Sequence, residues 1–320
     1  MTALDPASSP PLSACGLATR GVLTLAGPDR VRFLQGLVSN DVARAGVDRA
    51  VFAALLTPQG KMLFDLMLVG LAGDGADDVL LIEAETARLD DLRGRLSKYR
   101  LRSKITLAVA EGWSVAVLFG DGALAALDLP AEAGAARPLP DGGVAFVDPR
   151  LGTAGARLLL PTDSVHRVLE DLGARWVAPA VWDRHRLALG LPEGSPDIGV
   201  EKSLPLECGL EELGGVDFQK GCYMGQELTA RTKHRGLLKR RLMPVDVAGP
   251  LPEPGTPLRT ATGKDGGEMR SGLAFDDASG IGLAIVRLEA LAGGQPLEAG
   301  AARLTPRVPV WMRLPEAARV

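Results

Sequence analysis

Short apolar runs dominate the first seventy residues. Residues 21–25, 50–56 and 61–69 are such runs, and the last two flank the turn Thr57-Pro58-Gln59-Gly60. Apolar runs bounded by Pro and Gly are typical of strands, so the sequence predicts a β-hairpin over 50–69. Asp65 interrupts the second strand, where alternation places it with Leu63 and Met67; it either faces water or lines a pocket.

Helical spacing follows the run at 21–25 and a later strand at 79–83. One helix is predicted after Gly27-Pro28-Asp29, with Val31, Leu34 and Leu37 on one face, and another from Thr86 to Arg100, with Leu89, Leu92 and Leu96. Strand, helix and hairpin recur twice before residue 130. This order indicates paired α+β units rather than a βαβ unit.

The middle of the chain continues the α+β pattern up to about residue 190. Strands are predicted at 79–83, 105–109, 114–119, 144–147 and 157–160, and helices at 120–127, 162–173 and 179–189. Residues 130–142 are predicted as a loop. Residues 191–216 are irregular and polar, and Asp197, Glu201 and Glu207 stand there.

The sequence pattern changes after Arg241, where short predicted strands alternate with turns that contain Pro and Gly. The predicted strands are 242–247, 269–274, 281–286, 302–304 and 308–312. Regular short strands with turn signals predict a small barrel. We therefore expect two domains, 18–241 and 242–316.

The composition is that of a globular protein, and the basic residues are concentrated in one stretch of the chain. It has 320 residues, 46% hydrophobic and 23% charged, with a formal charge of −3. Residues 220–241 carry seven Lys or Arg against one acid, so this stretch is +6 and the remainder is negative. Local basicity suits a polyanionic ligand or an acidic partner surface.

Cysteine and histidine usage excludes several kinds of site. Cys15, Cys208 and Cys222 are far apart, without a CxxC pair, and only three histidines are present. This argues for a reducing compartment and against a self-contained zinc or iron–sulfur site. No G-x-S-x-G elbow or G-x-G-x-x-G after a strand occurs, so a serine hydrolase or a dinucleotide site is not expected.

No targeting signal is recognisable in the sequence. The first eleven residues lack a basic-then-apolar pattern, and no apolar run is long enough to cross a membrane. We therefore predict a cytoplasmic protein, although a matrix protein with a removed transit peptide would have the same sequence.

The richest candidate site surrounds Cys222. Gly221 and Gly225 bracket this thiol, and Lys220 precedes it in the most basic stretch of the chain. A positive field stabilises the thiolate, which makes Cys222 the best candidate for a nucleophile or a soft metal ligand. The alternative is a small buried residue in a glycine turn.

The stretch Lys220-Gly221-Cys222-Tyr223-Met224-Gly225-Gln226-Glu227, with Arg231 and Arg235-Gly236 behind it, resembles the signature of the YgfZ family. These are folate-binding proteins of iron–sulfur cluster assembly, related in fold to the aminomethyltransferase (T-protein) of glycine cleavage. Further matching stretches extend from about Gly21 to Trp311, among them Phe33-Leu34-Gln35-Gly36-Leu37 and Arg186-Leu187. The resemblance implies an aminomethyltransferase-like α+β fold: a multi-domain ring with ferredoxin-like units and a small C-terminal β-barrel.

The resemblance also implies a cofactor and roles for named residues. Tetrahydrofolate would be bound in the central hole, with Cys222, Lys220 and Asp65 as the reactive groups. Tyr223 would stack on the pterin, and the remaining folate contacts would come from Gln226, Glu227, Glu207, Arg231 and Arg235. Two positions depart from the transferase: its acid pair is represented only by Phe64-Asp65, and its glutamate falls at Ala188.

Three functions remain open on the sequence. The first is a folate-binding accessory protein of iron–sulfur assembly or repair, with an indirect effect on tRNA modification. The second is a folate-dependent aminomethyltransferase that uses Asp65, and the third is an RNA-binding module, which lacks interleaved aromatics. For the first we expect a monomer with iron–sulfur assembly or client proteins as partners, and no binding to membrane or nucleic acid.

Overall fold

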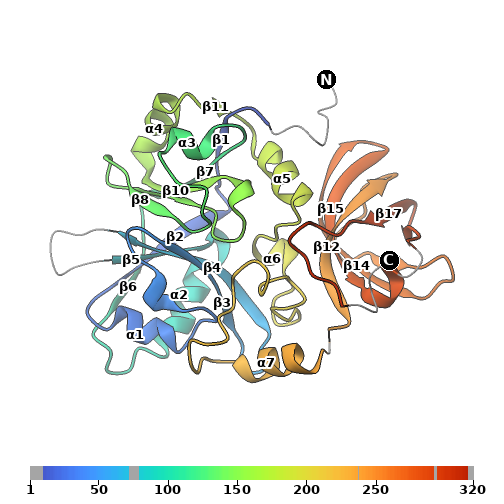
Figure 1. The fold of residues 1–320 in the computed structure, drawn as a ribbon, viewed down its shortest axis with the longest axis horizontal. Coiled ribbons are helices and arrows are strands. Elements are labelled where there is room, and N and C mark those ends of the chain that lie inside the picture. Colours follow the sequence, from blue (N-terminus) through green and yellow to red (C-terminus); the bar gives the residue numbers. More distant parts are fainter. Residues whose placement is uncertain (1–9, 72–78, 237, 292–293, 316–320) are drawn as a thin grey trace. The chain divides into compact units, whose positions relative to one another are not determined.

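The computed structural model describes residues 10–71, 79–236, 238–291 and 294–315 (Figure 1). The start of the predicted polar N-terminal segment and residue 316, the predicted end of the barrel domain, therefore lie outside the described residues. The chain divides into two compact units with interleaved segments. The first unit comprises Met1–Gln35, Asp41–Phe52 and Leu66–Trp182, and the second comprises Gly36–Asn40, Ala53–Asp65 and Asp183–Val320.

Two open sheets account for the strands up to residue 176. One has the order β11-β1-β7-β10-β9-β8, and the other has the order β3-β4-β5-β2-β6. The bounds are β1 Ser13–Gly16, β2 Arg20–Ala26, β3 Ala50–Leu56, β4 Met62–Leu71, β5 Val79–Glu85, β6 Thr106–Val109, β7 Trp113–Phe119, β8 Ala136–Pro138, β9 Val144–Val147, β10 Ala156–Pro161 and β11 Arg175–Trp176. Strands β2 and β7 contact each other, so the two sheets meet within the first unit.

Short helices accompany these sheets. They are α1 Arg30–Gln35, α2 Leu89–Ser97, α3 Ala123–Ala126, α4 Val165–Asp171, α5 Pro179–Ala188, α6 Gly194–Asp197 and α7 Gln226–Arg235. Helix α2 buries the three leucines that define its apolar face, Leu89, Leu92 and Leu96, as their helical spacing predicts. No helix in the described part of the chain is long and apolar enough to cross a membrane.

The predicted hairpin is confirmed as two strongly buried strands. All of β3 is buried, and so is β4 except for its last residue. Such continuous burial indicates strands covered on both faces. Strand β4 pairs antiparallel with β5, with Met67 opposite Glu83 and Leu68 opposite Ile82.

The C-terminal strands close into a six-stranded barrel, as the sequence predicts. Its order is β12-β15-β14-β13-β16-β17. The bounds are β12 Arg240–Ala248, β13 Pro257–Arg259, β14 Asp265–Asp276, β15 Ser279–Arg287, β16 Leu297–Ala299 and β17 Ala302–Pro306. A buried apolar core that includes Met243, Leu258 and Leu304 fills it.

Several local predictions need correction. Helix α6 forms inside the stretch 191–216, for which the sequence predicts irregular structure. The predicted strand at 308–312 does not form, since this segment includes Pro309, which has no N–H for a ladder, and it continues as a turn. Strand β8 lies inside the predicted loop 130–142, and α7 begins inside the glycine-rich signature.

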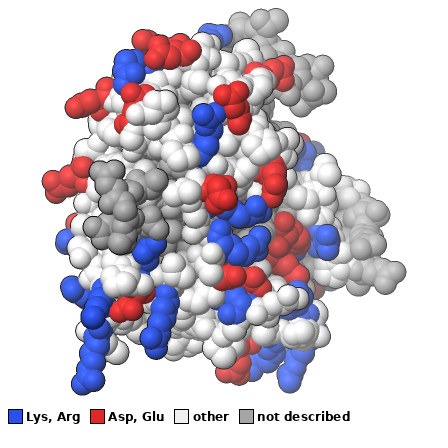
Figure 2. Space-filling view, turned by 60° about the vertical axis from the view of Figure 1, so that its left-hand side comes forward, with Lys and Arg blue, Asp and Glu red and all other residues white. Residues whose placement is uncertain are grey.

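Charged residues of both signs are mixed over the face in Figure 2, and Lys and Arg side chains extend along its lower edge.

Candidate functional site

The signature loop, residues 217–225, is anchored to the short segment 36–40 of the same unit. Lys220 Nζ donates to the carbonyl oxygens of Val38 and Asn40, at 2.7 Å each. Two backbone bonds add to this: Asp217 N–H donates to Ser39 O at 3.0 Å, and Met224 N–H donates to Gly36 O at 3.1 Å. Hydrogen bonds from a charged donor contribute about 1.5–3 kcal/mol each, so this anchoring fixes the loop.

Two glycines bring the signature loop against the turn of the β3–β4 hairpin. A Cβ on Gly225 would lie 2.4 Å from Thr57 O, and a Cβ on Gly60 would lie 2.7 Å from Gly225 O. Both glycines have positive φ, 82° and 78°. Two sequence motifs far apart in the chain thus meet because neither carries a side chain at the contact.

Cys222 is exposed at the tip of this loop, whereas Cys15 and Cys208 are buried. Gly221, just before it, has φ 92° with open space around its Cβ position, so glycine is favoured there by conformation alone. Burial, with the nearby Glu207 carboxylate, raises the pKa of the Cys208 thiol to about 12. Cys222 is therefore the cysteine that an external partner can reach.

Lys220 holds the loop rather than projecting freely beside the thiol. Besides its two carbonyl acceptors, its ammonium lies 5.3 Å from the ring centroid of Tyr223. These contacts position the residues on either side of Cys222. A role for Lys220 in ionising the thiol stays a prediction.

Tyr223 and Gln226 form the inner side of the loop. Tyr223 is buried, and burial together with Asp217 raises its pKa to about 12. Its backbone N–H donates to Gln226 Oε1 at 2.9 Å, which braces the turn into α7. Both residues thus have structural contacts, and their predicted folate contacts stay predictions.

The other predicted ligands on α7 lie at the surface. Glu227, Arg231 and Arg235 are exposed, and Glu227 and Arg231 form a loose ion pair at 3.7 Å. An exposed pair of this kind contributes little to stability. Near the end of the helix, Lys233 pairs with Glu211 at 2.9 Å and lies 3.7 Å from the ring centroid of Phe218.

Glu207 and Asp65 are both buried, in different settings. Glu207 accepts from Arg240 Nε at 2.7 Å and from the Leu204 N–H at 2.9 Å, so it ties its loop to the first barrel strand. Asp65 lies in β4 and is 4% exposed, which rules out the wet-face alternative. Its predicted part in chemistry stays a prediction.

Sequence reasoning missed a buried ion pair in the second unit. Asp197 is fully buried and accepts from Arg186 Nη1 at 2.6 Å and from the Glu193 N–H at 2.6 Å. Its carboxylate also contacts the Ser271 hydroxyl of β14, and its backbone oxygen accepts from Arg270. The signal in the sequence was an acidic residue in an irregular stretch. Solvated loops contain such residues too, so this signal did not identify a buried pair.

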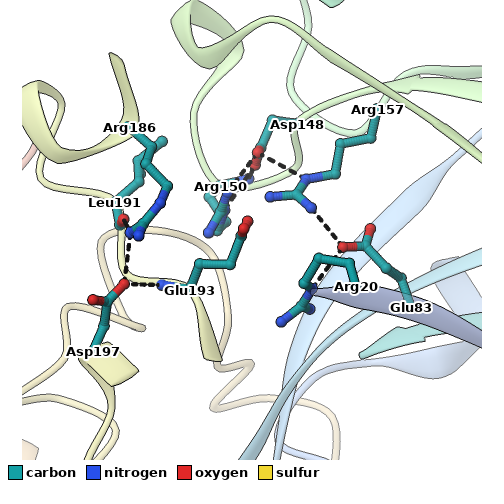
Figure 3. A network of polar contacts seen from close by, with 9 residues as sticks. All are labelled: Arg20, Glu83, Asp148, Arg150, Arg157, Arg186, Leu191, Glu193 and Asp197. Atoms are coloured by element: carbon teal, nitrogen blue, oxygen red, sulfur yellow. Dashed lines mark hydrogen bonds and ion pairs between the residues drawn. The ribbon is translucent and has the colours of Figure 1, made fainter. Parts of the chain in front are cut away.

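A second buried network lies within the first unit (Figure 3). Glu83 accepts from Arg20 Nε at 2.9 Å and from Arg157 Nη1 at 2.5 Å, and Arg157 reaches Asp148 at 3.4 Å. Asp148 is also held by Arg150 at 2.7 Å. Burial alone would raise the pKa of Asp148, but Arg150 and Arg157 hold it below its usual value. The signal in the sequence for this network was the presence of charged residues inside otherwise apolar strands.

The described residues hold no group of three or more His, Cys, Asp or Glu placed to bind a metal ion. A metal or cluster at Cys222 would therefore need ligands from beyond the described part of this chain. The loop presents one accessible soft donor, held in place by backbone contacts on two sides.

Comparisons with known proteins identify the fold. Residues 239–314 match the family model "CAF17, C-terminal beta-barrel domain". The chain is 19% identical to the aminomethyltransferase T of the glycine cleavage system from Bartonella henselae, with a TM-score of 0.74 over 94% of this chain and 86% of that one. This confirms the predicted aminomethyltransferase-like fold with a C-terminal barrel.

Relatives found by sequence identify the family of this chain. The human mitochondrial iron–sulfur cluster assembly factor IBA57 is 34% identical over 96% of this chain and 87% of its own length. The homologue from Neosartorya fischeri is 34% identical over 88% of this chain and 72% of its own length. Both names specify mitochondria, which contradicts the predicted cytoplasmic location. The chain belongs to the CAF17/IBA57 family, whose members named here are iron–sulfur cluster assembly factors.

Proposed function

We propose that this protein is an accessory factor of iron–sulfur cluster assembly or repair that lends Cys222 as a cluster ligand. The exposed thiol on an anchored loop is the observation that carries the proposal. Thiolates are the usual protein ligands of iron–sulfur clusters. The names of the relatives support the same process.

A single accessible thiol implies a shared cluster. Iron–sulfur clusters take about four protein ligands, and the described residues offer no second thiol at the surface. A partner protein or a small thiol would supply the others. The factor then holds a cluster only together with its partner, as suits transfer.

Complementation of a strain that lacks the endogenous factor tests this role. Cys222→Ala removes the sulfur and leaves the loop contacts of Lys220 and Met224, so we expect loss of rescue at normal protein levels. Cys15→Ala, at a buried position, is the matched control and should rescue. Full rescue by Cys222→Ala would contradict the proposal.

Tetrahydrofolate is the cofactor we propose for the same protein, as in the YgfZ family it resembles. The resemblance to that family supports a folate ligand, and α7 presents Arg231 and Arg235 one turn apart, which suits a carboxylate tail. Titration calorimetry with tetrahydrofolate should show binding that weakens in Arg231→Ala/Arg235→Ala. An effect on tRNA modification would be indirect, through iron–sulfur enzymes.

Aminomethyl transfer is the second candidate, favoured by the buried carboxylate of Asp65 in β4. Buried carboxylates at functional sites often have a tuned role. If this reading holds, purified protein with an aminomethyl donor should release methylene-tetrahydrofolate, and Asp65→Asn should abolish the release. No product from the unsubstituted protein rules it out.

A further inference from the structure

The turn between α2 and β6 has an unusual surface composition. Its sequence is Lys98-Tyr99-Arg100-Leu101-Arg102-Ser103-Lys104, with four bases and no acid. Every residue of this turn except Ser103 is exposed. We call these seven residues the 98–104 turn.

Leu101, in the middle of this turn, is both strained and exposed. Its φ is 42°, in the left-handed region that L side chains rarely adopt, and 90% of its surface is accessible. Asn or Gly would adopt this conformation at lower cost. Folding gains no burial from a leucine here, so its presence points to a contact outside the chain.

The side-chain cations of the turn are not held in ion pairs by the described part of the chain. Among the described residues, Lys98, Arg100, Arg102 and Lys104 form no ion pair, whereas the preceding helix pairs Arg93 and Arg95 with its own acids. Hydrogen bonds from backbone N–H groups hold the turn: Ser103 N–H donates to the Arg100 carbonyl oxygen at 2.7 Å, and Lys104 N–H donates to the Asp29 carboxylate at 2.7 Å.

We propose that the 98–104 turn binds an anionic lipid surface. Leu101 occupies the centre, Arg100 and Arg102 flank it, and the two lysines stand three residues away on each side. An apolar centre can enter the headgroup region while the flanking cations reach the phosphates, and the half-exposed Tyr99 suits the interface.

Other polyanions fit this arrangement less well. A nucleic-acid backbone would satisfy the cations and leave Leu101 in water, because phosphate contacts offer no apolar layer. An acidic protein would need carboxylates on both sides of an apolar pocket. A lipid surface supplies both layers along its whole extent. The proposal departs from the expectation that the chain meets no membrane, and the experiment below decides between them.

Cosedimentation of the full chain with vesicles tests the proposal. We expect binding to phosphatidylcholine vesicles that contain phosphatidylglycerol, weakening as salt rises, and none to pure phosphatidylcholine. Arg100→Gln/Arg102→Gln should weaken binding about 25-fold, at about fivefold per cation. Arg259→Gln/Arg303→Gln, on exposed barrel residues, makes the same change in net charge and should leave binding unchanged.

Leu101→Asn separates a lipid contact from a structural role. Asn tolerates the left-handed conformation, so this variant should melt at an equal or higher temperature and yet bind the vesicles at least about fivefold more weakly. The proposal would be overturned if the protein bound both types of vesicle equally, or if either turn variant bound the anionic vesicles as well as the unsubstituted protein does. Binding to immobilised RNA or polyglutamate without binding to vesicles would also overturn it.

Discussion

Tyr223 shows how one residue in the signature loop couples local burial to pH. Its phenol is buried beside the loop that carries Cys222, and burial raises its pKa to about 12. The free phenol of an unfolded chain titrates near pH 10. The neutral side chain therefore stabilises the fold fully below about pH 10, and that contribution is lost as pH rises towards 12.

Titration of phenolate absorbance should resolve this residue. The protein has two tyrosines, so we expect the folded protein to retain a transition near pH 12 that disappears in Tyr223→Phe. Circular dichroism at each pH would verify that the chain is still folded. A folded protein whose two phenols both titrate near pH 10 would contradict the burial described here.

Asp148 has the opposite dependence on pH, because its arginine neighbours lower its pKa. Its stabilising contribution is present above the unfolded value of about 4 and is lost as pH falls through the lower folded pKa. Asp148→Asn leaves buried guanidinium charge uncompensated and should cost about 3–5 kcal/mol at neutral pH.

Denaturant unfolding at several pH values checks the Asp148 prediction. The difference in unfolding free energy between the unsubstituted protein and Asp148→Asn should shrink as pH falls below about 4. Asp128→Asn, at an exposed ion pair with Arg137, is the control and should change stability by less than about 1 kcal/mol. A constant difference at all pH values would mean that Asp148 does not titrate with folding.

At the scale of elements, the signature loop depends on the hairpin turn that it touches. Gly221 and Gly225 have similar φ, 92° and 82°, but only the Cβ position of Gly225 is obstructed, by Thr57 O at 2.4 Å. Substitutions at these two glycines therefore distinguish two contributions to stability: the left-handed backbone conformation, which both require, and the close contact with the hairpin turn, which only Gly225 makes.

Alanine substitutions at these glycines should give different losses of stability. Gly221→Ala should cost about 1–2 kcal/mol, for the left-handed conformation alone. Gly225→Ala adds a backbone clash, so we expect at least about 2 kcal/mol more and weaker protection of the 57–60 and 217–225 amides in hydrogen exchange. Equal losses from thermal unfolding would show that the contact between loop and hairpin has no energetic weight.

The pattern of apolar residues predicted the elements that bury a long apolar run or one apolar face. The hairpin β3–β4, the leucine face of α2 and four of the barrel strands followed from apolar spacing alone. Strands β13 and β16, of three residues each, are too short to carry a period, and α7 is polar with glycines at both caps. Tertiary contacts specify such elements, and the sequence pattern does not show them.

At the scale of the whole molecule, the site was predictable where chemistry depends on residue type and spacing. Cys222 stood out because of its basic, glycine-rich neighbours, and the structure places it at the surface. The anchoring of Lys220 to Val38 and Asn40 joins segments about 180 residues apart in sequence. A single sequence without covariation carries no signal for such contacts.

The central proposal is that Cys222 is a cluster ligand that this chain shares with a partner. Anaerobic native mass spectrometry of the protein, mixed with a reconstituted iron–sulfur assembly protein, tests it directly. We predict a complex whose mass includes one iron–sulfur cluster, formed by the unsubstituted chain and by Cys15→Ala but lost in Cys222→Ala. A cluster retained in full by Cys222→Ala would contradict the account.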